Sequence, residues 1–245
     1  MSPLVKSALA VLALAACLSC GAQTSEGLVG DVGGALYRTP AITRTTERSN
    51  TVLPYLYADA GRWYARVDTF GVRMLPLGAG SLELAASVSF EAYRPANAAF
   101  DNRSTPLPVG VGSYQETPVG AFFLYAFRDL ASGGTLLEAT YAAELDAGPV
   151  HFYPQLGLER RSARYMQHLY GVGEAEAQRA SLAAYAPGGS VTPGVALAMD
   201  YALTDLLKLS AQVRKRWLDA SFTASPLVDA RTQVTGFVAL TRTFR

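Results

Sequence analysis

Hydrophobic and polar residues alternate along most of the chain after residue 27. In the run 207–216, for example, Leu207 and Leu209 are each followed by a polar residue. A period of two residues is typical of a β-strand, in which successive side chains point to opposite faces. Alternating runs of this kind cover about 27–38, 51–58, 62–74, 82–91, 115–127, 134–146, 150–161, 191–203, 207–216 and 232–244. The pattern predicts an all-β protein with about ten strands, and about twelve is the alternative count.

The clearest of these runs are about 10–13 residues long, which distinguishes two kinds of β-protein. Strands of a soluble β-sandwich are commonly about 5–6 residues long. A strand that crosses a bilayer at a tilt needs about 9–11 residues. Lipid offers the backbone no hydrogen-bond partner, so a sheet that spans a membrane has to close on itself. We therefore expect a closed antiparallel transmembrane β-barrel, with a soluble sandwich as the alternative.

The composition agrees with strands that have one apolar face. The chain has 245 residues, of which 50% are hydrophobic and 17% charged, and its mean hydropathy is +0.15. Soluble domains carry about 25% charged residues. No stretch reaches the roughly 18 apolar residues of a membrane-spanning helix. The net charge of +1 lacks the basic excess of a nucleic-acid-binding protein, so we expect no nucleic-acid partner.

The N-terminal residues have the pattern of a secretory signal peptide. Lys6 precedes an apolar segment at 7–18, and small residues at 19–22 suit cleavage after Ala22. The pattern therefore predicts export, with a signal peptide at 1–22 and a barrel domain at 23–245.

The alternative for this N-terminus is a lipoprotein signal. Leu14-Ala15-Ala16-Cys17 has the form of such a signal, in which Cys17 would carry the lipid. Cleavage after Ala22 would instead remove both Cys17 and Cys20. The mature chain would then contain no cysteine, which excludes thiolate-zinc and thiol redox chemistry.

Connection lengths predict two different ends of the barrel. The tight turns are 59–61, 146–148 and 204–205, and the long connections are 39–50, 163–190 and 219–231. Outer-membrane barrels have short periplasmic turns and longer extracellular loops. With a periplasmic N-terminus, two connections depart from this rule, because the long 95–113 would be periplasmic and the short 76–80 external. Within 163–190, good helix formers at Glu174 to Ala184 predict a short helix over the barrel mouth.

Charged residues on the inward faces of the strands have both signs. They are Asp31, Arg66, Asp68, Glu83, Glu91, Glu138, Glu144, Glu159, Arg161, Asp200, Lys208, Arg214 and Arg216. A barrel of about ten strands lies close to the size that side chains fill. We therefore expect paired charges that fill the interior, and a small-solute channel is the alternative.

The residues needed for catalysis or cofactor binding are sparse. His168 lies in a long loop where no Asp accompanies it, and His151 lies at the predicted periplasmic end of its strand, the wrong rim for an outer-membrane protease. We therefore expect hydrogen-bonded structural roles for both histidines. Glycine pairs such as Gly110 and Gly112 lack the Lys-Ser/Thr of a phosphate loop. No metal-spaced cluster of His, Asp and Glu is visible in the sequence. We expect no catalytic, cofactor or metal site, and keep a rim protease or lipase as a third class.

Motifs in the C-terminal third resemble those of a known family. They are Tyr165-Met166, Tyr170-Gly171-Val172, Tyr201-Ala202-Leu203-Thr204-Asp205, Trp217-Leu218-Asp219-Ala220 and Ala224-Ser225-Pro226-Leu227-Val228, with Leu53-Pro54-Tyr55-Leu56-Tyr57 upstream. Together they are similar to the MipA/OmpV family of outer-membrane proteins. In this chain the last strand ends in Arg245, with the aromatic Phe244 one residue before it.

The resemblance implies a location in the cell outer membrane and a function without catalysis. Family members are described as scaffolds that connect murein synthases to a lytic transglycosylase, or as surface-contact, adhesin-like proteins. The partners implied are the lipid bilayer and these murein enzymes, with 95–113 as the periplasmic segment nearest to them. We expect a monomer whose partner-contact loop residues are Tyr165, Tyr170, Gly171, Val172, Tyr185, Ser225 and Pro226.

Overall fold

A computed structural model describes residues 27–43, 49–89 and 99–245. Its strands are β1 (Val29–Thr39), β2 (Ser49–Ala60), β3 (Trp63–Arg66), β4 (Thr69–Leu77), β5 (Gly80–Ser87), β6 (Pro108–Thr117), β7 (Gly120–Asp129), β8 (Thr135–Ala143), β9 (Leu145–Ala147), β10 (Val150–Arg161), β11 (Ser190–Ala202), β12 (Leu207–Trp217) and β13 (Thr232–Phe244). Its helices are α2 (Ala163–Tyr170), α3 (Glu174–Ala180) and α4 (Ala220–Thr223). The predicted signal peptide and Cys17 lie outside the described residues.

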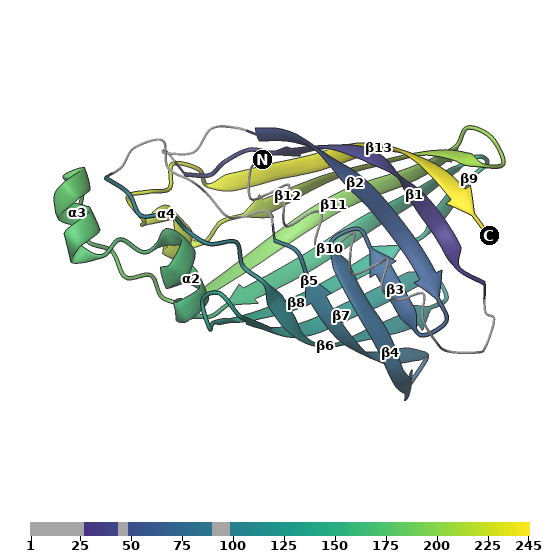
Figure 1. Cartoon of the computed structure of the whole chain (residues 1–245), viewed down its shortest axis with the longest axis horizontal. Helices are drawn as coiled ribbons and strands as arrows, with labels where there is room; N and C mark the ends of the chain where they lie inside the picture. Colours follow the sequence, from purple (N-terminus) through teal and green to yellow (C-terminus); the bar gives the residue numbers. More distant parts are fainter. Residues whose placement is uncertain (1–26, 44–48, 90–98) are drawn as a thin grey trace.

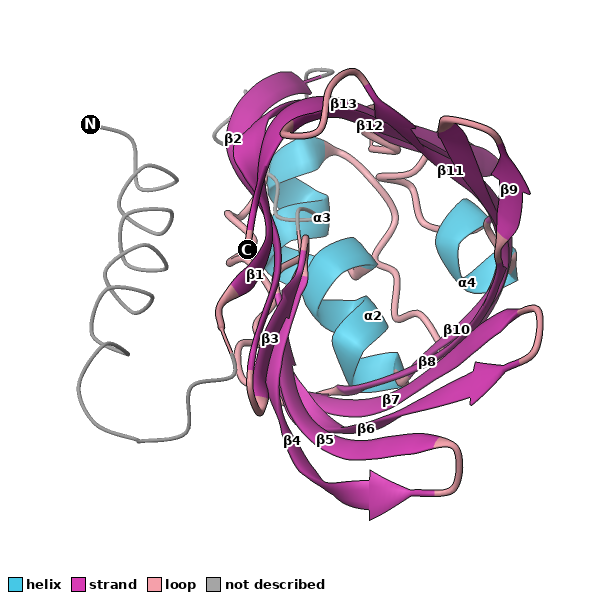
Figure 2. Ribbon diagram, turned by 90° about the vertical axis from the view of Figure 1, so that its right-hand side faces the viewer, coloured by secondary structure: helices cyan, strands magenta, loops and turns pink. Residues whose placement is uncertain are grey.

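The strands form one closed antiparallel barrel (Figures 1 and 2). Neighbours in the sequence pair with each other, β1 pairs with β13, and β10 also pairs with β11. β8 and β9 pair with successive parts of β10, so they form one interrupted strand of the wall and the barrel has twelve strands. Closure gives the backbone of neighbouring strands hydrogen-bond partners within the wall, as the apolar interior of a membrane requires.

The predicted fold class is confirmed, but the count of ten strands is wrong and the alternative of twelve is correct. The run 62–74 is divided by a tight turn in which Val67 has a φ of 57°, giving β3 and β4. The run 115–127 is divided by a turn before Gly120, which gives β6 and β7. Most of β6 falls within 95–113, which was predicted to be a connection.

The corrected count places the connections differently from the sequence prediction. We call one end of the barrel the short-turn rim, since it carries 61–62, 78–79, 118–119, 148–149 and 203–206. The other end is the long-loop rim, which carries the described residues 40–43, 88–89, 99–107, 130–134, 162–189 and 218–231. The prediction that 95–113 is a periplasmic connection opposite the other long loops is therefore wrong, as is the external assignment of 76–80. β1 begins and β13 ends at the short-turn rim, where Gly30 pairs with Phe244.

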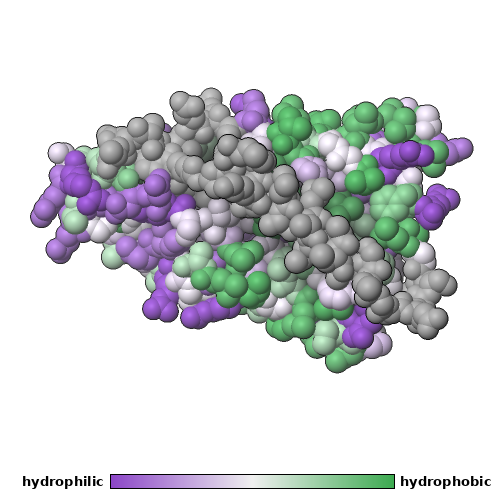
Figure 3. Space-filling view, in the orientation of Figure 1, coloured by the Kyte–Doolittle hydropathy of each residue, from purple (hydrophilic) through white to green (hydrophobic). Residues whose placement is uncertain are grey.

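Alternate side chains of the wall point outward and are apolar. Leu156 is 65% exposed, and Leu240 on β13 is 54% exposed, whereas the intervening residues face the lumen. A space-filling view shows hydrophobic residues over the barrel wall and hydrophilic ones at the end that carries the helices (Figure 3). This two-faced pattern is that of a wall between lipid and a polar interior.

No helix in the described residues has the length and apolar character needed to cross a membrane.

Candidate functional site

The long-loop rim is closed by a helix that lies within the outline of the barrel (Figure 2). Ser162 begins α2 as its N-cap, because its hydroxyl accepts a hydrogen bond from the Tyr165 amide at 3.4 Å. The inward face of α2 consists of Tyr165, Met166, Leu169 and Tyr170, none of which is more than 3% exposed. The helix therefore packs into the mouth of the barrel through a hydrophobic face.

Residues from distant parts of the chain surround α2. The Tyr170 ring lies 4.8 Å from that of Phe222 on α4, and Phe222 is 0% exposed. Asp219 begins α4 and accepts hydrogen bonds from the amides of Ser221 at 2.9 Å and Val191 at 2.7 Å. The cluster also contains Ile42, Ala85, Phe127, Leu136, Leu218 and Val228. Because these residues come from all sides of the wall, the rim behaves as one packed layer.

A second layer lies outside the first and is organised by a buried ion pair. Arg103, in the connection between β5 and β6, lies 2.8 Å from the Glu176 carboxylate on α3. The same arginine donates to the Gly171 carbonyl at 2.9 Å, and Glu176 accepts from the Asp101 amide at 2.9 Å. A smaller apolar cluster of Val172, Ala177 and Leu227 lies beside this pair. The β5–β6 connection is therefore fastened to α3 at the long-loop rim.

The structure brings the predicted partner-contact residues together at this rim. Tyr165, Tyr170, Gly171, Val172 and Ser225 are buried, and Tyr185 and Pro226 are half-buried. Ser225 donates to the Tyr170 carbonyl at 2.7 Å, and the Tyr185 hydroxyl donates to the Ser221 carbonyl at 3.0 Å. These contacts hold the loops in one shape. A partner contact by these residues stays a prediction.

Burial raises the pKa of the Tyr185 phenol above its ordinary value, and the nearby Asp219 carboxylate raises it further. The phenol is therefore neutral at physiological pH and keeps the proton that it donates to Ser221. This bond links the segment after α3 to the segment that contains α4, as does the Ser221 hydroxyl, which donates to the Gly189 carbonyl at 2.9 Å.

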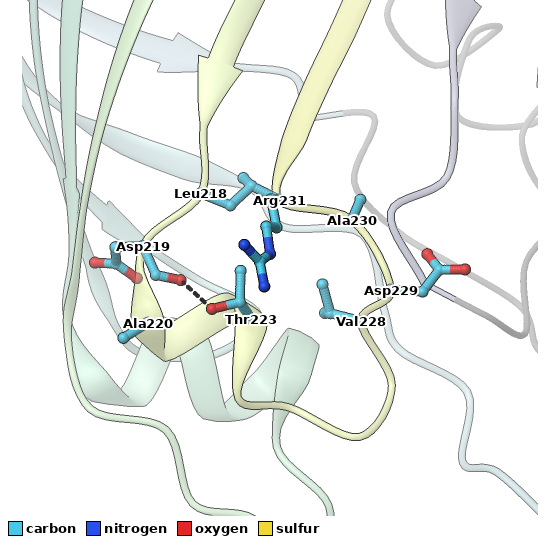
Figure 4. Close-up of a pocket in the computed structure, with 8 residues that line it drawn as sticks. All are labelled: Leu218, Asp219, Ala220, Thr223, Val228, Asp229, Ala230 and Arg231. Carbon is cyan, nitrogen blue, oxygen red and sulfur yellow. Dashed lines mark hydrogen bonds between the residues drawn. The ribbon is translucent and has the colours of Figure 1, made fainter.

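A pocket of about 460 Å³ lies beside α4 (Figure 4). Its lining consists of Leu218, Asp219, Ala220, Thr223, Val228, Asp229, Ala230 and Arg231. Thr223 donates to the Asp219 carbonyl at 3.2 Å, which fixes one wall of the pocket. All of its lining comes from the single connection between β12 and β13, so it is a surface feature of that loop.

The lumen below the rim holds paired charges, as the sequence predicted for most of the described positions. Arg66 lies 3.2 Å from Glu83, whose carboxylate also accepts from the Tyr125 hydroxyl at 2.8 Å. Lys208 lies 2.6 Å from Asp31 and 3.5 Å from Asp200. A third group joins Glu159 to Arg161 at 2.8 Å and to Arg216 at 2.7 Å. The predicted inward residue Glu91 lies outside the described part of the chain.

The structure places His168 beside a serine that the sequence analysis did not single out. His168 Nε2 lies 3.2 Å from Ser104 Oγ and 3.1 Å from the Ser104 carbonyl oxygen. A catalytic pair needs a free Nε2 lone pair facing the hydroxyl and an acidic group that orients Nδ1. Nε2 lies about as close to the Ser104 carbonyl oxygen as to the hydroxyl, and no described carboxylate bonds Nδ1. The geometry is that of a structural hydrogen bond between two loops.

Three potential metal-binding side chains also converge, where the sequence showed no metal-spaced cluster. Glu144, Asp146 and His151 have ligand atoms that all lie within 4.8 Å of one another at the short-turn rim. The tight hairpin between β9 and β10 accounts for this, since it folds His151 back onto Asp146. Glu144 and Asp146 lie two residues apart just before a two-residue turn, and this spacing is the signal in the sequence that could have predicted the arrangement.

Comparisons with known proteins were made on the sequence and the fold. A family model described as "MltA-interacting protein MipA" matches residues 32–244. The chain is also similar to "Putative outer membrane protein YiaT" of Escherichia coli O157:H7 and of Escherichia coli strain K12. Each is 24% identical over 227 residues, which cover 89% of this chain and 92% of the relative.

Two solved structures cover most of the chain at low similarity. Neisserial surface protein A is 15% identical with a TM-score of 0.29, covering 90% of this chain and 98% of its own. A bacterial polysaccharide outer membrane secretin is 11% identical with a TM-score of 0.34, covering 91% of this chain and 100% of its own. At these TM-scores the two structures add nothing to the fold described above.

Proposed function

Because the chain belongs to the MipA family of outer-membrane β-barrel proteins, we propose that it is a non-enzymatic scaffold for murein synthases and a lytic transglycosylase. The observation that carries this proposal is the family match, which extends from Val32 to Phe244 and so includes nearly the whole barrel. The family description names an MltA-interacting protein, and interaction with a murein enzyme is the property transferred here.

The closed rim favours a scaffold over the alternative of a small-solute channel. α2 and α4 lie within the outline of the barrel at the long-loop rim and pack on each other through Tyr170 and Phe222. Below them, Arg66 and Glu83 reach inward and pair. A pore for solutes would need an open path through both layers. We therefore propose that solute passage is not the function of this barrel.

We propose the short-turn rim for the partner contact, because the short turns of such barrels are periplasmic. Murein enzymes act on the periplasmic side of the outer membrane. This rim carries exposed aliphatic side chains at its turns, with Val119 63% and Leu206 52% exposed. Exposed apolar side chains at turn tips are suited to a contact with another protein. Residues 99–107 of the segment 95–113 lie at the opposite rim, so this segment is no longer the candidate for this contact.

Affinity capture of murein enzymes tests the scaffold role. Wild-type protein in detergent micelles is compared with a Val119→Glu, Leu206→Glu double variant and with Leu130→Glu. Leu130 is 61% exposed in the β7–β8 loop at the long-loop rim, so it is a matched control. We expect wild type and Leu130→Glu to retain a murein synthase or the transglycosylase and the double variant to lose it. Failure of wild type to retain either enzyme would reject the scaffold.

A surface-contact function is the second candidate, and it would use the long-loop rim. It is supported by the exposed outer face of α3, which the buried Arg103–Glu176 pair holds in place. The seven predicted contact residues lie around this layer and shape it. Binding of intact cells to host surfaces, compared before and after deletion of 173–184, tests this role. Unchanged binding after the deletion would exclude α3 from it.

A further inference from the structure

The hairpin of β9 and β10 carries a group of side chains that neither the barrel wall nor the scaffold role requires. His151 is the cross-strand neighbour of Asp146, and Glu144 lies two residues before Asp146 on the same strand of the wall. Residues two apart on a strand, and residues directly opposite on neighbouring strands, share one face. All three side chains therefore project from the same face of one hairpin.

This face is the inward one. Phe152 and Leu156 alternate with His151 on β10, and Leu156 is among the outward apolar residues of the wall. The three groups thus stand just inside the barrel at the short-turn rim. The side chains of His151 and Asp146 are 44% and 68% exposed, so an ion arriving from solution could reach them.

The contacts within the group leave coordinating atoms available. His151 Nδ1 lies 2.5 Å from Asp146 Oδ1, and the ligand atoms of all three residues lie within 4.8 Å of one another. Among the described residues, the Glu144 carboxylate has no ion pair. On the next strand Asp200 is the cross-strand neighbour of His151, and it is already bonded to Ser210 at 2.6 Å.

We propose that Glu144, Asp146 and His151 form a binding site for a divalent first-row transition-metal ion of the Zn²⁺ type. Bonds of about 2.0–2.2 Å in a tetrahedral arrangement place ligand atoms roughly 3.3 Å apart. The ligand atoms reach this separation when the His151–Asp146 contact opens slightly and the Glu144 carboxylate moves slightly closer to the other two groups. One imidazole with two carboxylates is a donor set for zinc-like ions, whereas Ca²⁺ and Mg²⁺ take oxygen ligands. Water completes the coordination.

The rigidity of the hairpin favours this assignment. Asp146 and His151 belong to neighbouring paired strands, and the Glu144 amide donates to the Val119 carbonyl at 3.1 Å on the adjacent turn. The ligands therefore start from a fixed backbone, and little ordering is needed when the ion binds. A site at this rim would place the ion on the hairpin beside the turn that contains Val119, without depending on the proposed scaffold role.

The site is tested with tag-free full-length protein in detergent micelles, titrated with ZnCl₂ in a calorimeter. The variants are His151→Ala and the nearly isosteric Glu144→Gln, and the control is His168→Ala at the other rim. Unboiled gel mobility checks that every variant is folded. CaCl₂ is titrated as the comparison ion, and the visible absorption of bound Co²⁺ reports the coordination.

We expect one Zn²⁺ per chain for wild type and for His168→Ala. His151→Ala and Glu144→Gln should each bind at least tenfold more weakly. Ca²⁺ should bind more weakly than Zn²⁺. Absence of saturable Zn²⁺ binding by wild type would overturn the proposal, and so would equal affinity in the His151→Ala variant. Equal binding of Ca²⁺ that does not depend on His151 would also overturn it, because the site would then be a carboxylate cluster alone.

Discussion

Arg103 and Glu176 lie 73 residues apart in the sequence and form a buried ion pair at the long-loop rim, with side chains only 9% and 3% exposed. The pair joins the connection after β5 to helix α3. It therefore places on one rim two segments that the sequence had assigned to opposite sides of the membrane. It is the buried one of two ion pairs between these segments, because Arg179 of α3 and Asp101 form a more exposed one.

Glu176→Gln should loosen the outer layer of the rim. The substitution keeps the shape of the side chain but leaves the Arg103 charge buried without its partner, which costs about 3–5 kcal/mol. We expect faster cleavage around 99–107 and 173–184 in limited proteolysis of folded protein, with the barrel strands protected. The matched control is Asp101→Asn, which removes the exposed pair with Arg179, whose side chain is 45% exposed. An exposed pair is worth less than about 1 kcal/mol, so equal cleavage of the two variants would contradict this prediction.

Glu83→Gln should destabilise the barrel from within. Glu83 is 0% exposed and accepts from Arg66, Tyr125 and Ser81. Removal of its charge leaves Arg66 unpaired in the lumen, at a cost of about 3 kcal/mol or more. Urea unfolding of protein in lipid vesicles, followed by tryptophan fluorescence, measures the loss. Asp59→Asn is the control, because the Asp59–Arg73 pair is more exposed and should change stability by less than about 1 kcal/mol.

Gly134→Ala should displace α2 and open the rim. A Cβ atom at Gly134 would lie 2.5 Å from the Tyr165 amide nitrogen, closer than atoms can pack. In planar bilayers we expect no steady conductance from wild type and measurable conductance from Gly134→Ala. Gly173→Ala is the control, since a Cβ there meets nothing within 4 Å. Robust steady conductance from wild-type protein would instead support the channel alternative.

Ser104→Ala and His168→Ala should not change hydrolytic activity, because we expect the wild-type protein to have none. Among the described residues no carboxylate bonds His168 Nδ1, and Nε2 lies at 3.1 Å from the Ser104 carbonyl oxygen as well as at 3.2 Å from the hydroxyl, so the pair lacks the orienting group of a general base. Wild type and both variants should release nitrophenol from short-chain nitrophenyl esters at the rate of a buffer blank. Ester cleavage by wild type that either substitution abolishes would restore the rim hydrolase as a candidate function.

The alternation of hydrophobic and polar residues was enough to predict most strands of the barrel wall. The run 232–244 became β13 almost residue for residue, because a strand with one lipid face and one lumen face has to alternate. The same reasoning failed at β6, where Gly110 and Gly112 remove one side of the alternation. Gly112 is needed there because a Cβ atom would lie 2.0 Å from the Tyr125 ring. The reason for that glycine is a contact with the neighbouring strand, so the run itself does not reveal it.

The sequence by itself determined the class of fold, the location and the family, since these follow from the period of the side chains and from local motifs such as Tyr170-Gly171-Val172. It also predicted that the charges of the lumen would pair. Only the tertiary structure decided which loops share a rim, that Phe222 packs on Tyr170, and that His151 meets Asp146 and Glu144. The physical reason lies in the strand count: one unrecognised turn reverses the side of each connection that follows it until a second unrecognised turn restores it, as happened between β3 and β7. Contacts between loops depend on that side rather than on local residue preference.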